Sequence, residues 1–185
     1  MKRTIAVFIP ILIFASLLSG RAYPASTGQT LAVSVQDIEP FVYFCLRYKG
    51  PFSQIQEAIG KLLENAKFQN IAPMGPLIGI YYSSPADVKP EALDWEVGFP
   101  TTPQIFVQAP LEKKEWNFTR VAVALHKGFY ETVGDTIMKI LDWMDSNGYA
   151  QGGPILERYM DMDPSSVRPE DLRTEIWVPV KKKGV

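Results

Sequence analysis

The sequence contains a single cysteine, Cys45, and a single histidine, His126, among its 185 residues. One cysteine cannot form an intrachain disulfide, so the fold has to be stable without one. One histidine excludes a metal site built from several histidines, and no other cluster has the spacing of metal ligands. A phosphate-binding loop, a Gly-x-Ser-x-Gly motif and a Cys-x-x-Cys-His motif are also missing, so we expect no cofactor.

A large charge of either sign is missing as well, since 19 basic residues stand against 20 acidic ones. Removal of residues 1–22 takes away three basic residues and no acid, which leaves 16 against 20 and a net charge of −4. A nucleic-acid-binding protein needs a basic face, so we expect no nucleic-acid partner. The three lysines at 181–183 are better explained as a solvated chain end.

The N-terminus carries the one long apolar run of the chain. Lys2 and Arg3 precede an apolar segment at residues 4–18, and small residues then lead to Ala22 or Ala25. The run is shorter than the ~20 residues that a membrane-spanning helix needs, so the pattern predicts a secretory signal peptide in residues 1–25. The alternative is an uncleaved N-terminal anchor, which would be the only contact with a membrane. We therefore expect residues 26–185 to form one exported bacterial domain, periplasmic or extracellular.

Most of this domain consists of an internal sequence repeat. The segment SPADVKPEALDWEVGFP, residues 84–100, recurs near the C-terminus as DPSSVRPEDLRTEIWVPV, residues 163–180. Upstream the shift is smaller by one position, so that Lys49-Gly50 recurs as Lys127-Gly128 and Tyr81 recurs as Tyr159. Self-similarity at a fixed period indicates two copies of one unit, approximately residues 31–100 and 105–180. Each is too short to bury a core well alone, so we expect a pseudo-symmetric pair with a cleft at the two-fold axis.

Hydrophobic periodicity assigns the same elements to both copies. Strands are expected at residues 31–38, 41–48, 77–82, 94–99, 105–109, 119–126, 155–160 and 174–180, with a polar loop from Leu111 to Asn117. Helices with one apolar stripe are expected through Ile55–Leu63 and Val133–Met144, and Ile59, Leu63, Ile137 and Leu141 should be buried. Each unit is thus β-α-β-β after an extra strand. The fold class is α+β, an antiparallel sheet with two main helices on one face.

Five segments, in this order, carry a resemblance to a known family: YKGPF, GPLIGIYYSSP, HKGFYETV, GGPILERYMDMDP and RPEDLRTEIWVPV. Over Leu31 to Val180 the chain resembles the GyrI-like small-molecule-binding family, also called the AraC-type effector-binding domain, which is related in fold to the SOUL haem-binding proteins. The resemblance implies tandem β-α-β-β units with a ligand cleft at their junction. There, aromatic rings and a carboxylate would receive a small hydrophobic, often cationic molecule. Many members add a DNA-binding helix-turn-helix where this chain has its predicted signal peptide.

Strand alternation selects candidate residues for this cleft. Glu175 and Trp177 share one face of the last strand, and Glu157 and Tyr159 share one face of the strand before it. We expect both pairs to meet in the cleft, because aromatic faces around a carboxylate form a cage for a lipophilic cation. The alternative is that Glu175 is a surface residue paired with Arg158 or Arg173.

The first copy offers a weaker half-site. Glu96 corresponds to Glu175, but Gly98 stands where the second copy has Trp177, and Trp95 is expected to compensate from the loop side. Tyr81 is either a cleft residue or an aromatic at the core edge with its hydroxyl in water. The ligand-binding set predicted from these arguments is Glu175, Trp177, Tyr159, Glu157, Tyr81, Glu96 and Trp95.

The absence of a nucleophile–base motif favours a binding protein over an enzyme. The resemblance leaves a second class open, a hydrolase of strained electrophilic toxins in which Glu175 positions water and Trp177 holds the substrate. A third class, a protein-interaction module, is implied by gyrase inhibition in the family, but an exported chain would not meet gyrase. His126 directly precedes Lys127-Gly128 and is expected to hold that turn rather than to act in catalysis or to ligate haem.

Overall fold

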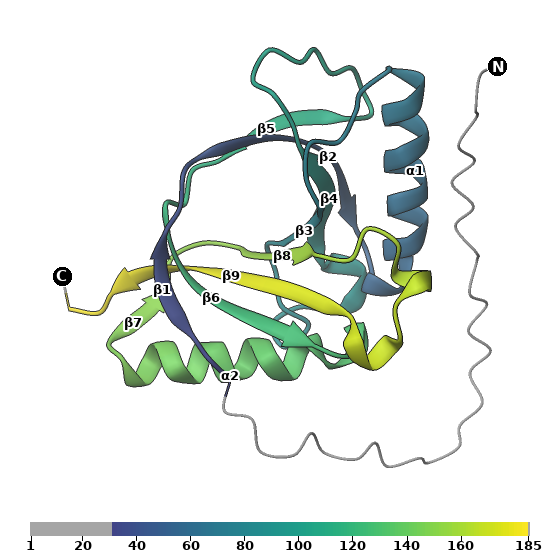
Figure 1. Ribbon diagram of the computed structural model, residues 1–185. Coiled ribbons are helices and arrows are strands. Elements are labelled where there is room, and N and C mark those ends of the chain that lie inside the picture. The colour runs from purple at the N-terminus through teal and green to yellow at the C-terminus, as the bar shows by residue number, and fades with distance from the viewer. Residues whose placement is uncertain (1–30, 185) are drawn as a thin grey trace.

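The computed structural model describes residues 31–184, and Figure 1 shows them as one strongly curved sheet with two helices on its outer side. The predicted signal peptide lies outside the described residues. The strands are β1 Ser34–Asp37, β2 Phe41–Lys49, β3 Leu77–Tyr81, β4 Asp94–Pro100, β5 Glu112–Trp116, β6 Arg120–Lys127, β7 Tyr149–Gln151, β8 Ile155–Tyr159 and β9 Arg173–Lys182. The helices are α1 Ile55–Phe68 and α2 Val133–Ser146, and the short 3-10 turns are η1 Phe52–Gln54, η2 Pro90–Ala92, η3 Tyr130–Thr132, η4 Pro164–Ser166 and η5 Pro169–Asp171. The predicted α+β class, with an antiparallel sheet and two main helices, is confirmed.

Counted from the two ends of the sheet, equivalent strands of the two repeats occupy the same places. The strand order runs β1-β6-β9-β8-β3-β4-β2-β5, with the short β7 added on β9, and all pairs are antiparallel. The leading strand of each repeat crosses to the other one, because β1 pairs with β6 of the second repeat and β5 pairs with β2 of the first. Through this exchange each repeat completes the sheet of its partner.

The pseudo-two-fold axis passes between β3 and β8. Leu77 pairs with Tyr159, Gly79 with Glu157, and Tyr81 with Ile155. Gly79 and Glu157 are related by the same shift along the chain as Tyr81 and Tyr159, so two equivalent positions of the repeats face each other directly across the axis.

Both helices pack on the outer face of the sheet, α1 on β2 and β4 and α2 on β6 and β9. The buried positions follow one row of each helix, with Leu62 and Ile140 at 0% exposure. The prediction that Ile59, Leu63, Ile137 and Leu141 are buried was wrong, because all four are only half-buried and the buried row lies one residue earlier in each helix. Gly148 just after α2 has a φ of 77°, a conformation that glycine adopts without strain, and it follows the end of the helix.

The inner face of the curved sheet closes on itself around a third core, separate from the two under the helices. Its buried residues come from both repeats and are Tyr43, Cys45, Ile78, Ile80, Trp116, Val121, Val123 and Leu156. Because the sheet bends until its flanks meet this cluster, the inner face needs no helix to cover it. Among residues 31–184, no helix is long and apolar enough to cross a membrane.

Two element predictions were wrong. Residues 105–109 form a loop, whereas β5 lies in the expected polar loop at Glu112–Trp116. β5 is an edge strand with exposed Glu112, Lys113 and Glu115, so it lacks the apolar alternation that marks a strand covered on one face. The three-residue strand β7 was also not predicted.

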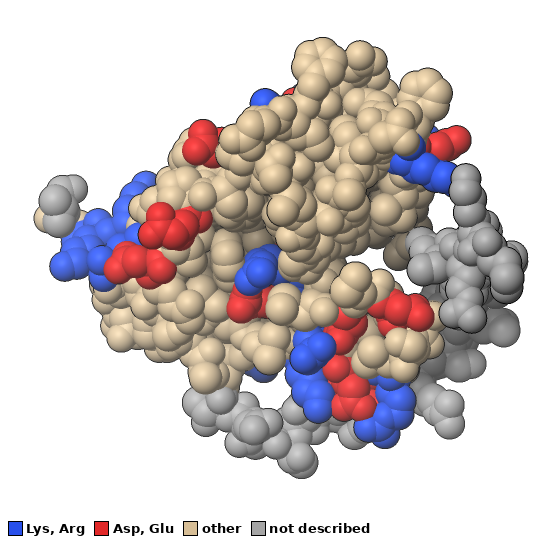
Figure 2. All heavy atoms as spheres, turned by 45° about the horizontal axis from the view of Figure 1, so that its top comes forward, with Lys and Arg blue, Asp and Glu red and all other residues tan. Residues whose placement is uncertain are grey.

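Charges are unevenly distributed over the surface. Figure 2 shows a broad surface with few charges at the top and a dense red and blue cluster at the lower right. The sequence has no charged residue from Val97 to Leu111, and Phe68, Met74 and Phe106 are exposed. Ion pairs instead follow the connection before β9, where Arg168 and Lys127 both pair with Asp171.

Candidate ligand-binding site

A chain of hydroxyl groups lies at the pseudo-two-fold axis on the outer face of the sheet. Tyr81 extends from β3 and Tyr159 from β8, and their hydroxyl oxygens are 2.7 Å apart. Tyr159 also donates to the Glu157 carboxylate at 2.9 Å. Because Tyr159 has one hydroxyl proton and gives it to Glu157, Tyr81 must be the donor within the tyrosine pair.

A further ring packs edge-on against each of these tyrosines. Phe52 of η1 lies 5.2 Å from the Tyr81 ring at 79°, and Tyr130 of η3 lies 5.5 Å from the Tyr159 ring at 87°. Phe52 and Tyr130 are themselves equivalent positions of the two repeats. We call these four rings and Glu157 the axial site. It contains two symmetric aromatic pairs around one carboxylate.

Gly79 explains why the site has a single carboxylate. A Cβ atom at this position would lie 2.8 Å from the Tyr81 hydroxyl oxygen and 3.0 Å from its ring, so the glycine lets the ring lie across the strand. At the equivalent position of the second repeat, Glu157 carries a side chain, and its carboxylate accepts the hydrogen bond from Tyr159. Each repeat therefore contributes two aromatic rings to the site, but only the second repeat contributes a carboxylate.

The carboxylate of Glu157 is buried, at 8% exposure. Within residues 31–184 no lysine, arginine or histidine forms a salt bridge with it. Burial raises the pKa of Glu157 to about 7, although the hydroxyl groups of Tyr159 and Tyr81 act to lower it. Burial, followed by the nearby Glu157, also raises the pKa of Tyr81 and of Tyr159 well above 10. The site thus holds a carboxylate that titrates near neutral pH between phenols that stay protonated.

The structure separates the two residue pairs that the sequence placed together. Arg158 faces Glu175 and Leu156 faces Trp177 across β8 and β9, so Glu175 and Trp177 lie on the inner face, opposite Glu157 and Tyr159. The alternation within each strand was correct. The pairing register between the strands was wrong by one residue, and a shift of one residue turns every side chain to the other face.

Glu175 has its own partners on that inner face. It forms an ion pair with Arg158 and accepts a hydrogen bond from Trp177 Nε1 at 2.9 Å. The Arg158 guanidinium lies 4.8 Å from the Trp177 ring centroid. The alternative in which Glu175 pairs with Arg158 is therefore what the structure shows, and a protein cation already occupies the position expected for a ligand.

Glu96 and Trp95 also lie on opposite faces. Glu96, at 1% exposure, accepts from Tyr43 at 2.7 Å, Tyr82 at 2.9 Å and Lys114 at 2.6 Å on the inner face. Trp95 is buried under α1 and donates to the Gly50 carbonyl at 2.9 Å, so it does not approach Glu96 from a loop. Glu96 ties β4 to the edge strand β5 across β2. Neither residue is part of the axial site.

His126 holds the segment that carries Tyr130. Its Nε2 lies 3.1 Å from the Phe129 carbonyl oxygen and its Nδ1 lies 2.7 Å from Thr136 Oγ1. The carbonyl requires the proton on Nε2, so Nδ1 accepts from the threonine. Burial lowers the pKa of His126, which favours this neutral form. The predicted role in holding the turn is confirmed.

Two residues of the axial site were not predicted from the sequence. Phe52 and Tyr130 flank the two tyrosines, and Gly79, which leaves room for the Tyr81 ring, was not predicted either. The repeat spacing contained the signal, because Phe52 and Tyr130 are related by the same shift along the chain as Tyr81 and Tyr159.

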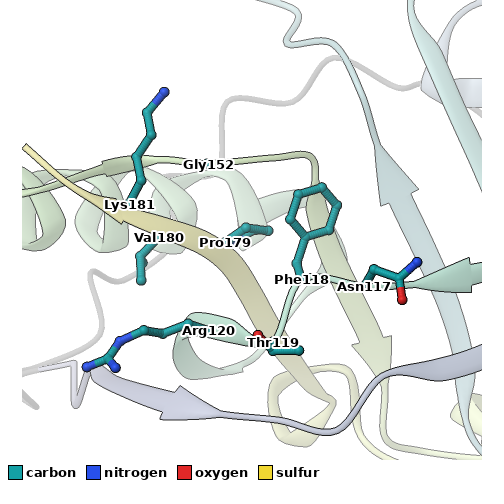
Figure 3. Close-up of a pocket in the computed structure, with 8 residues that line it drawn as sticks. All are labelled: Asn117, Phe118, Thr119, Arg120, Gly152, Pro179, Val180 and Lys181. Atoms are coloured by element: carbon teal, nitrogen blue, oxygen red, sulfur yellow. The ribbon is translucent and has the colours of Figure 1, made fainter. Parts of the chain in front are cut away.

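A hollow of about 270 Å³ lies elsewhere, where the loop before β6 meets β9. Figure 3 shows Phe118 and Pro179 beside it, with Arg120 and Lys181 extending away from the Phe118 ring. No carboxylate lines it. Within residues 31–184, no group of three or more histidine, cysteine, aspartate or glutamate side chains is placed to hold a metal ion.

The model of a known family, described as the GyrI-like small molecule binding domain, matches residues 32–181. The chain belongs to the GyrI-like family. No curated protein matches it significantly. Among solved structures, the EcmrR–DNA complex shares the fold of this GyrI-like domain at a TM-score of 0.69 and 17% identity over 82% of this chain. The match spans only 58% of that longer chain.

Two further structures share the GyrI-like fold. One is a hydrolase encoded by lin2189 from Listeria innocua, with a TM-score of 0.62 and 13% identity over 80% of this chain and 91% of that one. The other is SAV2435 bound to tetraphenylphosphonium, with a TM-score of 0.55 and 12% identity over 81% of this chain and 94% of that one. At these identities the likeness extends to the fold alone.

Proposed function

We propose that this GyrI-like domain binds hydrophobic cations at the axial site, with Glu157 as the charge partner. The observation that carries the proposal is a buried carboxylate to which no cationic side chain of residues 31–184 is paired. The two other carboxylates considered from sequence differ in this respect, because Glu96 pairs with Lys114 and Glu175 with Arg158.

The energetics of the site favour a cation. A buried carboxylate loses its hydration, and one phenol hydrogen bond replaces only part of it. A ligand cation would restore a full charge partner in surroundings of low dielectric, where the attraction is stronger than in water. The ring faces of Tyr81, Tyr159 and Tyr130 would add cation–π attraction and apolar contact.

Access and relatives support the same function. Tyr81, Tyr159 and Tyr130 are each partly exposed, so solvent borders the rings that surround Glu157. The family takes its description from small-molecule binding. SAV2435, which shares the fold, binds tetraphenylphosphonium, a cation whose charge is enclosed by aromatic rings. That ligand is therefore the appropriate first probe.

We also propose that residues 1–25 direct export, so that binding takes place in the periplasm or at the cell surface. Support comes from Lys2 and Arg3 ahead of a short apolar run that ends in small residues. An exported domain would bind its ligand outside the cytoplasm, where it would act as a capture protein.

Calorimetry with tetraphenylphosphonium at pH 8 tests the binding proposal. Glu157→Gln keeps the shape and removes the charge, so affinity should fall about ten- to a hundredfold, as expected for a charge-assisted interaction. Glu175→Gln is the matched control on the opposite face and should leave affinity within about twofold. A loss of binding in Glu175→Gln with none in Glu157→Gln would move the site to the inner face.

A further inference from the structure

The two repeats differ strongly beside the axial site. In the first repeat, Trp95 stacks on Tyr48 at 5.0 Å and meets the Phe52 ring edge-on at 6.1 Å. The equivalent position in the second repeat is Thr174, directly before Glu175 as Trp95 is directly before Glu96. A threonine side chain is too short to reach the ring of Tyr130 as Trp95 reaches that of Phe52. At position 174 the second repeat therefore has no ring to pack against Tyr130.

Thr174 is fully buried, and its hydroxyl has no partner. Its exposure is 0%, and among the side chains of residues 31–184 its Oγ1 is the one buried polar atom without a hydrogen bond. Burial of an unpaired hydroxyl costs free energy, and proteins rarely leave one unpaired. A specific orphan of this kind beside a candidate ligand site therefore needs a physical explanation.

The neighbours of Thr174 are already committed to other groups. Thr174 pairs with Tyr159 on β8 and with His126 on β6, so all three side chains stand on the outer face. The Tyr159 hydroxyl is taken by Glu157 and Tyr81. Both ring nitrogens of His126 are also taken, by Thr136 and by the Phe129 carbonyl. The hydroxyl thus lies one strand from the axial carboxylate with its bonding capacity unused.

We propose that the Thr174 hydroxyl is a ligand-binding group, so that the ligand extends from Glu157 beneath Tyr130 and presents a hydroxyl or carbonyl group to Thr174. The inference rests on the proposed function of the axial site. By analogy with Phe52 over Trp95, the cover over Thr174 is Tyr130 in the single turn η3, which has to swing outward when the ligand enters.

The geometry defines the ligand class. Glu157 on β8 pairs with Ile176 on β9, and Thr174 lies two residues before Ile176. With ordinary strand spacing, the Cα atoms of Glu157 and Thr174 are then about 8 Å apart. The ligand is therefore an aromatic cation with a hydrogen-bonding substituent roughly one ring length from its charge. The symmetric tetraphenylphosphonium ion meets only the first requirement.

A matched pair of probes tests this, tetraphenylphosphonium and its para-hydroxyphenyl triphenylphosphonium analogue, with calorimetry on the folded domain. The wild type should bind the hydroxylated probe about three- to tenfold more tightly, the range of one neutral hydrogen bond. Thr174→Val deletes the hydroxyl at constant shape and should abolish that preference, while Thr174→Ser should retain it. The melting temperature of Thr174→Val should stay equal or rise, because the orphan hydroxyl is removed.

The failures are distinguishable. If both probes bind the wild type equally, or if Thr174→Val keeps the preference, the role of Thr174 is refuted and the axial site stands. If Thr174→Val lowers the melting temperature and weakens both probes alike, Thr174 is a packing residue and the inference is likewise refuted. If tetraphenylphosphonium does not bind the wild type at all, the proposed function fails, and the inference fails with it.

Discussion

Gly79 and Glu157 occupy equivalent positions in the two repeats, and they also lie directly opposite each other in the sheet. A second carboxylate at position 79 would face Glu157 across the axis, and like charges directly opposite each other destabilise a sheet. The site can therefore carry one negative charge only. Positions 79 and 157 have to differ, because identical repeats would place two glutamates directly opposite each other at the axis.

The first prediction concerns Gly79. In Gly79→Ala the new Cβ meets the Tyr81 hydroxyl at 2.8 Å, so the Tyr81 ring has to shift, which disturbs its hydrogen bond with Tyr159. We expect a loss of about 1–3 kcal/mol in the free energy of unfolding, as for other overpacked core positions, together with weaker cation binding. Gly60→Ala is the matched control, since a Cβ there meets nothing within 4 Å and should stabilise α1 by up to ~1 kcal/mol. Urea unfolding of both variants measures these changes. Equal free energies of unfolding of Gly79→Ala and Gly60→Ala would contradict the predicted contact with Tyr81.

The second prediction is a pH dependence of stability. The pKa of Glu157 is raised to about 7 by burial, whereas a glutamate in an unfolded chain titrates near ~4.3. Between these values the folded state binds more protons, so the free energy of unfolding should fall as pH rises from about 4.5 to 7, by on the order of 3 kcal/mol. Glu157→Gln should remove this decline and exceed the wild type in stability at pH 8. Urea unfolding of both proteins at pH 5 and pH 8 measures this decline. An equal change in the free energy of unfolding of the wild type and Glu157→Gln would contradict the prediction.

Cation binding should show the opposite pH dependence, which is the third prediction. A cation prefers the ionised carboxylate, so below the pKa of about 7 binding has to displace the proton from Glu157. Affinity for tetraphenylphosphonium should then fall up to about tenfold for each pH unit below 7. Glu157→Gln, which cannot titrate, should bind with a flat pH profile and is the control for this measurement. A wild-type affinity that stays constant between pH 5 and pH 8 would mean that the bound cation does not interact with Glu157.

The repeats, the fold class and the equivalence of Tyr81 and Tyr159 could be predicted from the sequence, because these depend on spacing within the chain. The sequence could not predict which residues meet across strands. Glu175 shares a face with Trp177 as expected, but whether that face also holds Glu157 depends on an inter-strand register set by tertiary packing. The strand at Glu112–Trp116 was missed for a related reason, since an edge strand in solvent carries no apolar pattern.

The fourth prediction concerns residues 1–25. If they are a cleaved signal peptide, mass spectrometry of the native protein should find a mature N-terminus near Tyr23 or Ser26. An intact Met1 in the membrane fraction would instead support the uncleaved anchor. An intact Met1 in the cytoplasmic fraction would rule out export.

The last prediction tests the direction of the hydroxyl chain from Tyr81 through Tyr159 to Glu157. Tyr159→Phe removes two hydrogen bonds, the one to the buried carboxylate and the one from Tyr81, whereas Tyr81→Phe removes only the bond between the two neutral phenols. Bonds to charged groups contribute about 1.5–3 kcal/mol and neutral ones about 0.5–1.5 kcal/mol, so at pH 8 Tyr159→Phe should cost more. At pH 5 Glu157 is protonated and its bond with Tyr159 becomes a neutral one, so the difference between the two losses should narrow. Urea unfolding of both variants at the two pH values measures the difference. Equal losses at pH 8 would mean that Tyr159 does not donate to Glu157, and the order of the chain would have to be reversed.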